Sequence, residues 1–226
     1  MTKEVSSIVK EIIAGVDKTI TGKYDALTGR TYVCQTKWAR IGKTVTDSSN
    51  NVFTILELVD DKYIVANDVN GVHLNGVITL NTPYWITGTK MSANREWTIA
   101  GNHLTDKTPL VWLLELIRYK SYGRDSTLDF ETELRLFILD ETNITQFYVA
   151  DHREQVVLPM ENLANEIMNV INANRKFVRV EEYNVYSFSR FGVEKETGMF
   201  QNILDANLSG VELRFTLKKY KENCKC

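Results

Sequence analysis

Near the start of the chain, apolar residues recur every three or four positions, which is the spacing of an amphipathic α-helix. Over residues 4–20 this spacing gathers the following side chains on one side of a helix: Val5, Ile8, Val9, Ile12, Ile13, Val16 and Ile20. A stripe of about four turns is more apolar surface than a helix normally exposes to water. We therefore expect it to pack against the rest of the chain or against a neighbouring chain.

A second helix is predicted from Pro159 onward. Proline is favoured in the first turn of a helix, because its missing N–H would be unpaired there in any case. Glu161 in the same turn suits the positive end of the helix dipole. The apolar stripe of this helix consists of Met160, Leu163, Ile167, Val170 and Ile171. A short buried helix is also predicted for the apolar run that follows Pro109 and ends near Gly123.

Between residues 31 and 97 the helical spacing disappears and short strand patterns replace it. The clearest hairpin has strands at Val52–Val59 and Tyr63–Val65, with a turn at Asp60 and Asp61. Residues 21–31 read as a turn-rich connection into this block. Short strands at this spacing are typical of a small barrel or sandwich.

Polar and apolar residues alternate again in two later segments, which predict two strands that pair with each other. "ELRLF" at 133–137 and "VELRF" at 211–215 share the order Glu-Leu-Arg. If the two strands are antiparallel, the Glu of one can face the Arg of the other while apolar side chains fill the core. The predicted core face consists of Leu134, Leu136 and Ile138 in the first strand and Val211, Leu213, Phe215 and Leu217 in the second. Phe137 and Leu139 then make both faces of the first strand apolar.

Helical and sheet-forming segments thus flank a block that contains only strands. The predicted fold class is α+β, with a mixed sheet and packed helices, plus an inserted small β-barrel or β-sandwich domain. The larger domain is predicted to comprise residues 1–29 and 101–226, and the insert residues 30–100.

Composition excludes little beyond this. The chain has 226 residues, of which 27 are basic and 29 acidic, so its net charge of −2 gives it no overall attraction to nucleic acid. It has no run of about 18 apolar residues, the length that a membrane span needs. Glu4, Glu11 and Asp17 near the start are unlike a signal peptide. An odd number of cysteines, three, predicts reduced thiols.

The most chemically suggestive stretch is Asp151-His152-Arg153-Glu154, just before the second helix. These ionisable residue types are common in active sites, but a catalytic site also needs partners that converge on them from elsewhere. No second motif with a catalytic spacing accompanies them. The favoured interpretation is a polar surface turn or a subunit contact, and a catalytic loop is the alternative.

The remaining candidate sites are weak. His73 and His103 have no second ligand at the i+4 spacing of a metal-binding helix. "TITGKYD" lacks the first glycine and the final Ser or Thr of a phosphate-binding loop. Cys224 and Cys226 would make at most half of a soft-metal site. The sequence therefore predicts no cofactor and no metal. Its tryptophans are expected in the core or at a protein interface rather than stacked on bases.

The order of several segments is more informative than any single motif. "LNTPYWITGTKMSANREW" is followed by "TPLVWLLE", "ELRLFILD", "LPMENLANEIM" and finally "NLSGVELRFTL". This order resembles tailed-bacteriophage neck proteins, in particular the tail-terminator and head–tail completion group. Those proteins have a terminal helix, a sheet, a helix packed across it, and a late strand with an LxGVxLxFxL-like pattern. The matching residues of that pattern are Gly210, Val211, Leu213, Phe215 and Leu217.

The resemblance covers roughly residues 1–29 and 101–220 and implies a non-enzymatic subunit of a ring in the virion neck. Such rings are usually hexamers, with a dodecamer as the alternative, and they are assembled in the host cytoplasm. The implied partners are copies of the chain and other neck and tail-tube proteins. DNA would pass through the lumen without specific binding, and no membrane is involved.

Residues expected at subunit contacts are Val5, Ile8, Ile12, Val16, Leu213, Phe215, His152 and Arg153. Two other functions stay open from the residues alone. One is a nucleic-acid-binding module that uses the inserted β domain. The other is an enzyme of unknown class that uses the Asp151–Glu154 segment.

Overall fold

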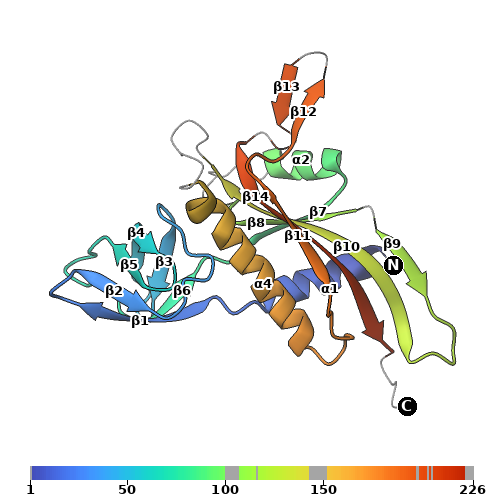
Figure 1. The fold of residues 1–226 in the computed structure, drawn as a ribbon, viewed down its shortest axis with the longest axis horizontal. Coiled ribbons are helices and arrows are strands. Elements are labelled where there is room, and N and C mark those ends of the chain that lie inside the picture. The colour runs from blue at the N-terminus through green and yellow to red at the C-terminus, as the bar shows by residue number, and fades with distance from the viewer. Residues whose placement is uncertain are drawn as a thin grey trace.

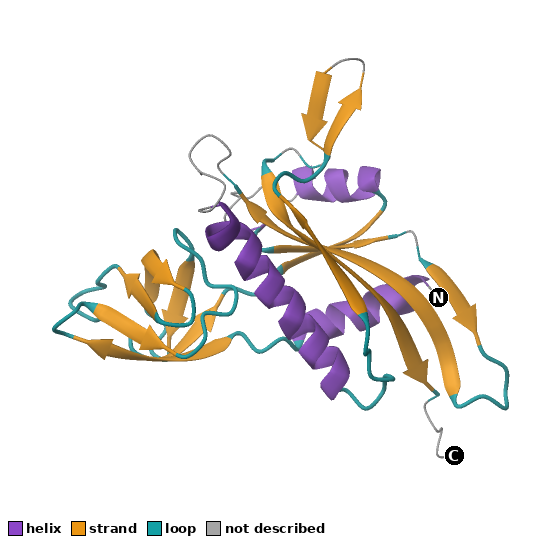
Figure 2. Cartoon of the chain, viewed as in Figure 1, coloured by secondary structure: helices purple, strands orange, loops and turns teal. Residues whose placement is uncertain are grey.

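A computed structural model describes residues 2–99, 107–115, 117–142, 152–196, 199–202, 204 and 206–221. The fold is α+β, with a closed barrel of six strands beside a mixed sheet, as the sequence predicts (Figure 1). The barrel projects to one side of the large sheet, and helices pack on that sheet (Figure 2).

Six short strands form the barrel in the order β1-β2-β5-β4-β3-β6. Their bounds are β1 Thr19–Asp25, β2 Arg30–Val33, β3 Thr44–Asp47, β4 Val52–Val59, β5 Tyr63–Ala66 and β6 Gly76–Leu80. The predicted hairpin is therefore confirmed as β4 and β5. Alternate residues such as Phe53, Ile55 and Ile64 point inward and are fully buried. Gly22 is required in β1, because a Cβ there would come within 2.5 Å of Thr31 Cγ2.

The start of the barrel differs from the predicted organisation. Residues 21–31, expected as a connection, form most of the β1–β2 hairpin. The first helix, α1 (Thr2–Ala14), ends before Gly15, so Ile20 lies in β1 rather than in the helix. The position of Ile20 fits both the helical spacing from Val16 and the alternating spacing of a strand. Its pairing with β6 in the sheet places it in the strand. The barrel strands consequently run from Thr19 to Leu80, whereas the predicted insert spans residues 30–100.

The large sheet has the strand order β11-β14-β10-β8-β7, and β9 also pairs with β10. Its strands are β7 Tyr84–Gly88, β8 Leu110–Leu114, β9 Arg118–Ser121, β10 Leu128–Glu141, β11 Tyr183–Phe188 and β14 Leu208–Tyr220. Only β7 and β8 pair in parallel, and the other neighbours are antiparallel. A separate hairpin consists of β12 (Val193–Glu196) and β13 (Met199–Asn202).

The helix predicted after Pro109 is wrong, because this segment forms β8 and β9. All five residues of β8 are buried. A strand covered on both faces is continuously apolar, so its sequence pattern cannot be distinguished from that of a buried helix.

β10 and β14 pair antiparallel over nearly their whole length, as the shared Glu-Leu-Arg order predicts. Leu134 lies opposite Phe215, and Leu136 lies opposite Leu213. Gly210 has a φ of 151°, and a Cβ there would overlap the carbonyl oxygen of Ile138. The glycine of the terminal pattern is therefore needed for close approach of the two strands.

Helix α1 and helix α4 (Leu158–Ala173) cover one face of the sheet, and the short helix α2 (Lys90–Ile99) lies over the other (Figure 1). The stripe of α1 packs in one continuous core with α4, the sheet and the barrel interior. The chain itself thus covers this stripe.

Buried charges join the barrel to the end of β10. The Asp140 carboxylate is 1% exposed and accepts ion pairs from Arg40 at 2.9 Å and Lys43 at 3.1 Å. Lys43 also donates a hydrogen bond to Thr108, two residues before β8 begins. On the opposite side of the joint, the Lys37 ammonium bonds to the backbone and side chain of Asp17, and α4 contributes a bond from Asn162 to the Lys37 carbonyl.

We predict that Asp140→Asn destabilises the whole chain, because it leaves two buried cations without their shared carboxylate. Removing one partner of a buried ion pair costs about 3–5 kcal/mol. Asp129→Asn is the matched control, since Asp129 lies on the same strand and pairs with Lys219, but its side chain is 45% exposed. That change should cost about 0–1 kcal/mol. Urea unfolding of the two variants checks the difference, and equal stabilities would contradict the role given to Asp140.

Candidate functional site

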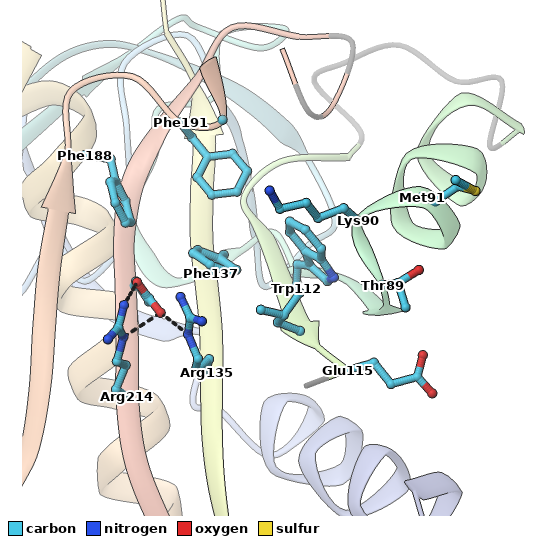
Figure 3. A pocket seen from close by; sticks show the side chains of 13 residues that line it. Thr89, Lys90, Met91, Trp112, Glu115, Arg135, Phe137, Phe188, Phe191 and Arg214 are labelled. Atoms are coloured by element: carbon cyan, nitrogen blue, oxygen red, sulfur yellow. Dashed lines mark hydrogen bonds and ion pairs between the residues drawn. The ribbon is translucent and has the colours of Figure 1, made fainter. Parts of the chain in front are cut away.

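The sheet face opposite α1 and α4 carries a pocket of about 870 Å³. Its aromatic walls come from β8, β10 and the end of β11, and Figure 3 shows these rings gathered beside α2. The rings are Trp112, Phe137, Phe188 and Phe191. Phe191 lies edge-on to Trp112 with the ring centroids 6.0 Å apart. An apolar pocket of this size is the default binding-site hypothesis for a chain of unknown function.

Charged side chains border the pocket where β10 and β14 pair. Glu212 is 2% exposed, and its carboxylate accepts hydrogen bonds from Arg135 Nε at 2.5 Å and Arg214 Nε at 2.7 Å. Arg214 adds a second bond through Nη2 at 2.8 Å. The predicted register of these charges is wrong: Arg135 lies directly opposite Arg214, Glu133 lies opposite Thr216, and Glu212 lies opposite Phe137. Glu212 reaches Arg135 only diagonally across the two strands, and its carboxylate is buried.

The buried carboxylate fixes the electrostatics of this group. Burial alone would raise the pKa of Glu212, but the hydrogen bonds from Arg214 and Arg135 outweigh it and lower the pKa. Glu212 therefore stays ionised and holds both guanidinium groups against the sheet. Arg135 also lies over the Phe137 ring, and Arg214 lies over Tyr186. Within this group of three side chains, one carboxylate faces two guanidiniums, so the group carries one excess positive charge.

The sequence favours a surface turn for Asp151–Glu154, but the described part of this segment is helical. Asp151 lies outside the described residues, and Arg153–Val157 form a π-helical turn that leads into α4. His152 Nε2 reaches Ser209 Oγ at 2.9 Å, whereas Arg153 is largely exposed and approaches Glu161. Glu154 lines a groove beside the barrel. Successive helical residues point in different directions, so these side chains do not converge.

The contact between His152 and Ser209 is also unlike a nucleophile and its base. The Ser209 hydroxyl donates to the Ser189 carbonyl oxygen at 2.8 Å, so the histidine Nε2–H must be the donor to Ser209. Asp140, which pairs with Ser209 in the sheet, is already bound to Arg40 and Lys43. The group therefore has the bonding of a structural network that closes the end of the sheet.

The expected interface residues differ in how far they are exposed. Five of them are buried in the chain's own core and are not on its surface: Val5, Ile12, Val16, Leu213 and Phe215. Ile8 packs partly against that core, and His152 is half-buried. Arg153 alone is largely exposed, with 65% of its side chain accessible. The apolar stripes that the sequence displays are thus used for folding, and the exposed candidate surfaces lie elsewhere.

The barrel surface bears on the nucleic-acid alternative. Tyr32 is 44% exposed and lies edge-on to Tyr63, whose ring is covered by Arg30 at 4.1 Å. The Tyr63 hydroxyl donates to Glu57 at 2.5 Å. A base-stacking platform needs open ring faces in a basic groove. Here one ring face is occupied by Arg30, and a carboxylate lies beside it.

The other candidates yield no site. His73 contacts Asp68 at 2.6 Å and stacks on Tyr24, while His103, Cys224 and Cys226 lie outside the described residues. Cys34 is an exposed free thiol. Among the residues described, no group of three or more metal-ligating side chains is close enough to hold an ion. In the same residues, no helix has the length and apolar character to cross a membrane.

Comparison with known proteins identifies no relative: no family model, no curated protein and no solved structure matches this chain. The candidate site therefore depends on its geometry alone. The sequence prediction missed the pocket, although Phe137, which helps to make β10 apolar on both faces, was its one visible signal.

We predict that Glu212→Leu destabilises the chain by about 1–3 kcal/mol, because it leaves two adjacent guanidiniums without their shared acceptor. Glu133→Leu is the control, since it lies on the same face of the neighbouring strand, and it should change stability by about 0.5 kcal/mol or less. Chemical denaturation measures both. A Glu212→Leu variant as stable as the parent would show that the arginine pair needs no counter-charge.

We also predict a pH dependence that involves His152. Burial and the nearby charge of Arg40 lower the pKa of His152 below its ordinary 6.5. The unfolded chain therefore binds a proton at a higher pH than the folded chain, and stability falls as the pH drops below about 6.5. The melting temperature should fall less steeply between about pH 7 and pH 5 in His152→Gln than in the parent protein. Identical pH profiles would contradict this assignment.

Proposed function

We propose that this chain is a structural subunit of a bacteriophage neck. In this proposal, copies form a ring at the head–tail junction or at the end of the tail tube, as a tail terminator or completion protein. The ring is a hexamer, with a dodecamer as the alternative, and it belongs to the virion after assembly in the host cytoplasm. Its partners are other neck and tail-tube proteins, and DNA passes through the lumen without specific binding.

The observation that supports the proposal is that the two edges of the sheet are different. β11 forms one edge, and among the described residues no strand pairs with its outer side. β7 and β9 form the other edge, where β9 is exposed along its full length. Because these surfaces are not copies of each other, subunits that join through them assemble head to tail, which closes a ring when the rotation permits.

The edge strand β11 has the properties of a contact surface. Tyr183, Val185 and Tyr186 are between 37% and 45% exposed. An exposed edge strand with apolar side chains is a template for pairing with another chain, and monomeric proteins usually avoid it. A neighbouring subunit that pairs with this edge would protect it from pairing with unrelated chains.

The order of elements along the chain also supports the proposal. α1, the sheet, α4 across it and the late strand β14 occur in the order that the neck proteins have. The alternatives have less support. The Asp151–Glu154 side chains that are described diverge, which weakens the enzymatic reading, and the barrel aromatics are poorly arranged for base stacking.

The decisive experiment is a nonsense mutation of this gene in the phage that encodes it, grown with and without a suppressor host. We expect the non-suppressing host to yield tails of aberrant length or unjoined heads and tails in electron micrographs, and the suppressor to restore virions. Antibody labelling of intact virions should locate the chain at the neck. Normal infectious particles that lack the protein would refute the proposal.

A further inference from the structure

We propose that the β1–β2 turn of one copy inserts Leu27 into the aromatic pocket of the next copy, with the Asp25 carboxylate facing Arg135 and Arg214. The inference deepens the proposed function, on which it rests, by naming one contact of the ring. The contact joins two different surfaces, so it fits a head-to-tail assembly.

The turn is built to present an apolar side chain. Leu27 is 97% exposed, and no other large apolar side chain among those described is so accessible. Its loop is ordered by local bonds: Asp25 accepts from the Leu27 backbone N–H at 3.0 Å and from the Thr28 hydroxyl at 3.0 Å. The Gly29 N–H closes the turn on the Asp25 carbonyl at 2.9 Å. A preordered turn loses little conformational entropy on binding.

The pocket is large and apolar enough to receive this turn. Its rings pack against one another and form the apolar floor of the pocket, whose volume of about 870 Å³ is ample for Leu27 and part of the turn. Each copy carries both an apolar pocket and, elsewhere on its surface, an apolar side chain that fits such a pocket. When the side chain of one copy enters the pocket of the next, the contact joins two different surfaces and is heterologous. The turn cannot reach its own pocket, because it forms the far end of the barrel while the pocket lies beside α2 (Figures 1 and 3).

Charge adds orientation to this contact. The lining includes the cations Lys90, Arg135 and Arg214 and the acids Glu115 and Glu212. Arg135 uses only Nε on Glu212, so its terminal nitrogens remain for an incoming carboxylate. Asp25 lies two residues from Leu27, and a carboxylate has about four lone-pair positions, more than the loop uses. An apolar side chain beside a carboxylate thus matches aromatic rings beside a guanidinium pair.

The test begins with self-association of the purified full chain, measured by sedimentation velocity over a wide concentration range. Leu27→Asp should weaken association by about ten- to a hundredfold, because a buried leucine would be replaced by a charge. Leu56→Asp is the matched control, an exposed leucine on another barrel strand, and it should leave association unchanged. A parent protein that stays monomeric, or equal effects of the two changes, would overturn the inference.

A mixing experiment tests the head-to-tail character. Phe188→Asp removes the pocket while keeping the turn, and Lys90→Glu at the exposed rim is a second pocket variant less able to disturb the fold. Each pocket variant alone should fail to associate. Mixed with Leu27→Asp, either should form a dimer through the one intact turn and pocket, and no larger species. Failure to form this mixed dimer would overturn the contact.

The outcomes separate the two proposals. Rings or oligomers that form normally from Leu27→Asp would remove the turn–pocket contact and leave the neck function standing. Turn-dependent association together with normal virions in the absence of the protein would keep the contact and remove the neck function.

Discussion

The long antiparallel pair of β10 and β14 is the interaction on which the rest of the structure depends. The two strands pair over nearly their full lengths of 14 and 13 residues. On one side of this ribbon, Leu134, Leu136, Leu213 and Phe215 form the floor on which α1 and α4 pack. On the other side, the same ribbon carries the aromatic pocket and its arginine pair. Gly210 permits the close approach that keeps the register, because any side chain there would collide with Ile138.

Two buried carboxylates at different points of this ribbon have different consequences. Asp140 at the end of β10 neutralises Arg40 and Lys43, and so fixes the barrel against the sheet. Glu212 in β14 holds two partly exposed guanidiniums at the pocket. A buried ion pair gains little net stability over apolar packing, but it penalises any arrangement that separates the charges. Both groups are therefore best understood as determinants of geometry, of the barrel in one case and of the pocket in the other.

In the proposed ring, the attachment of the barrel to the sheet determines how neighbouring copies would meet. Barrel interior, α1, α4 and one sheet face form one continuous core, so the β1–β2 turn is presented at a set position relative to the pocket. A knob on a freely moving domain would join neighbours at many angles and would not define a ring. In the proposed assembly, a fixed barrel would make each added subunit repeat the same rotation, which ring closure requires.

The sequence by itself determined the amphipathic stripes of α1 and α4, the β4–β5 hairpin and the pairing of β10 with β14, because each has a strong local period. The shared Glu-Leu-Arg order did not give the charge pairing, because the register places Arg135 opposite Arg214 and Glu212 opposite Phe137. Tertiary structure alone decided that Leu110–Leu114 is a strand, since a segment buried on both sides has no period to read. It decided likewise that the barrel begins at Thr19 and that residues 152–157 are helical. The pocket was beyond the sequence for the same reason: its rings come from residues 112, 137, 188 and 191, and only the folding of separate strands brings them together.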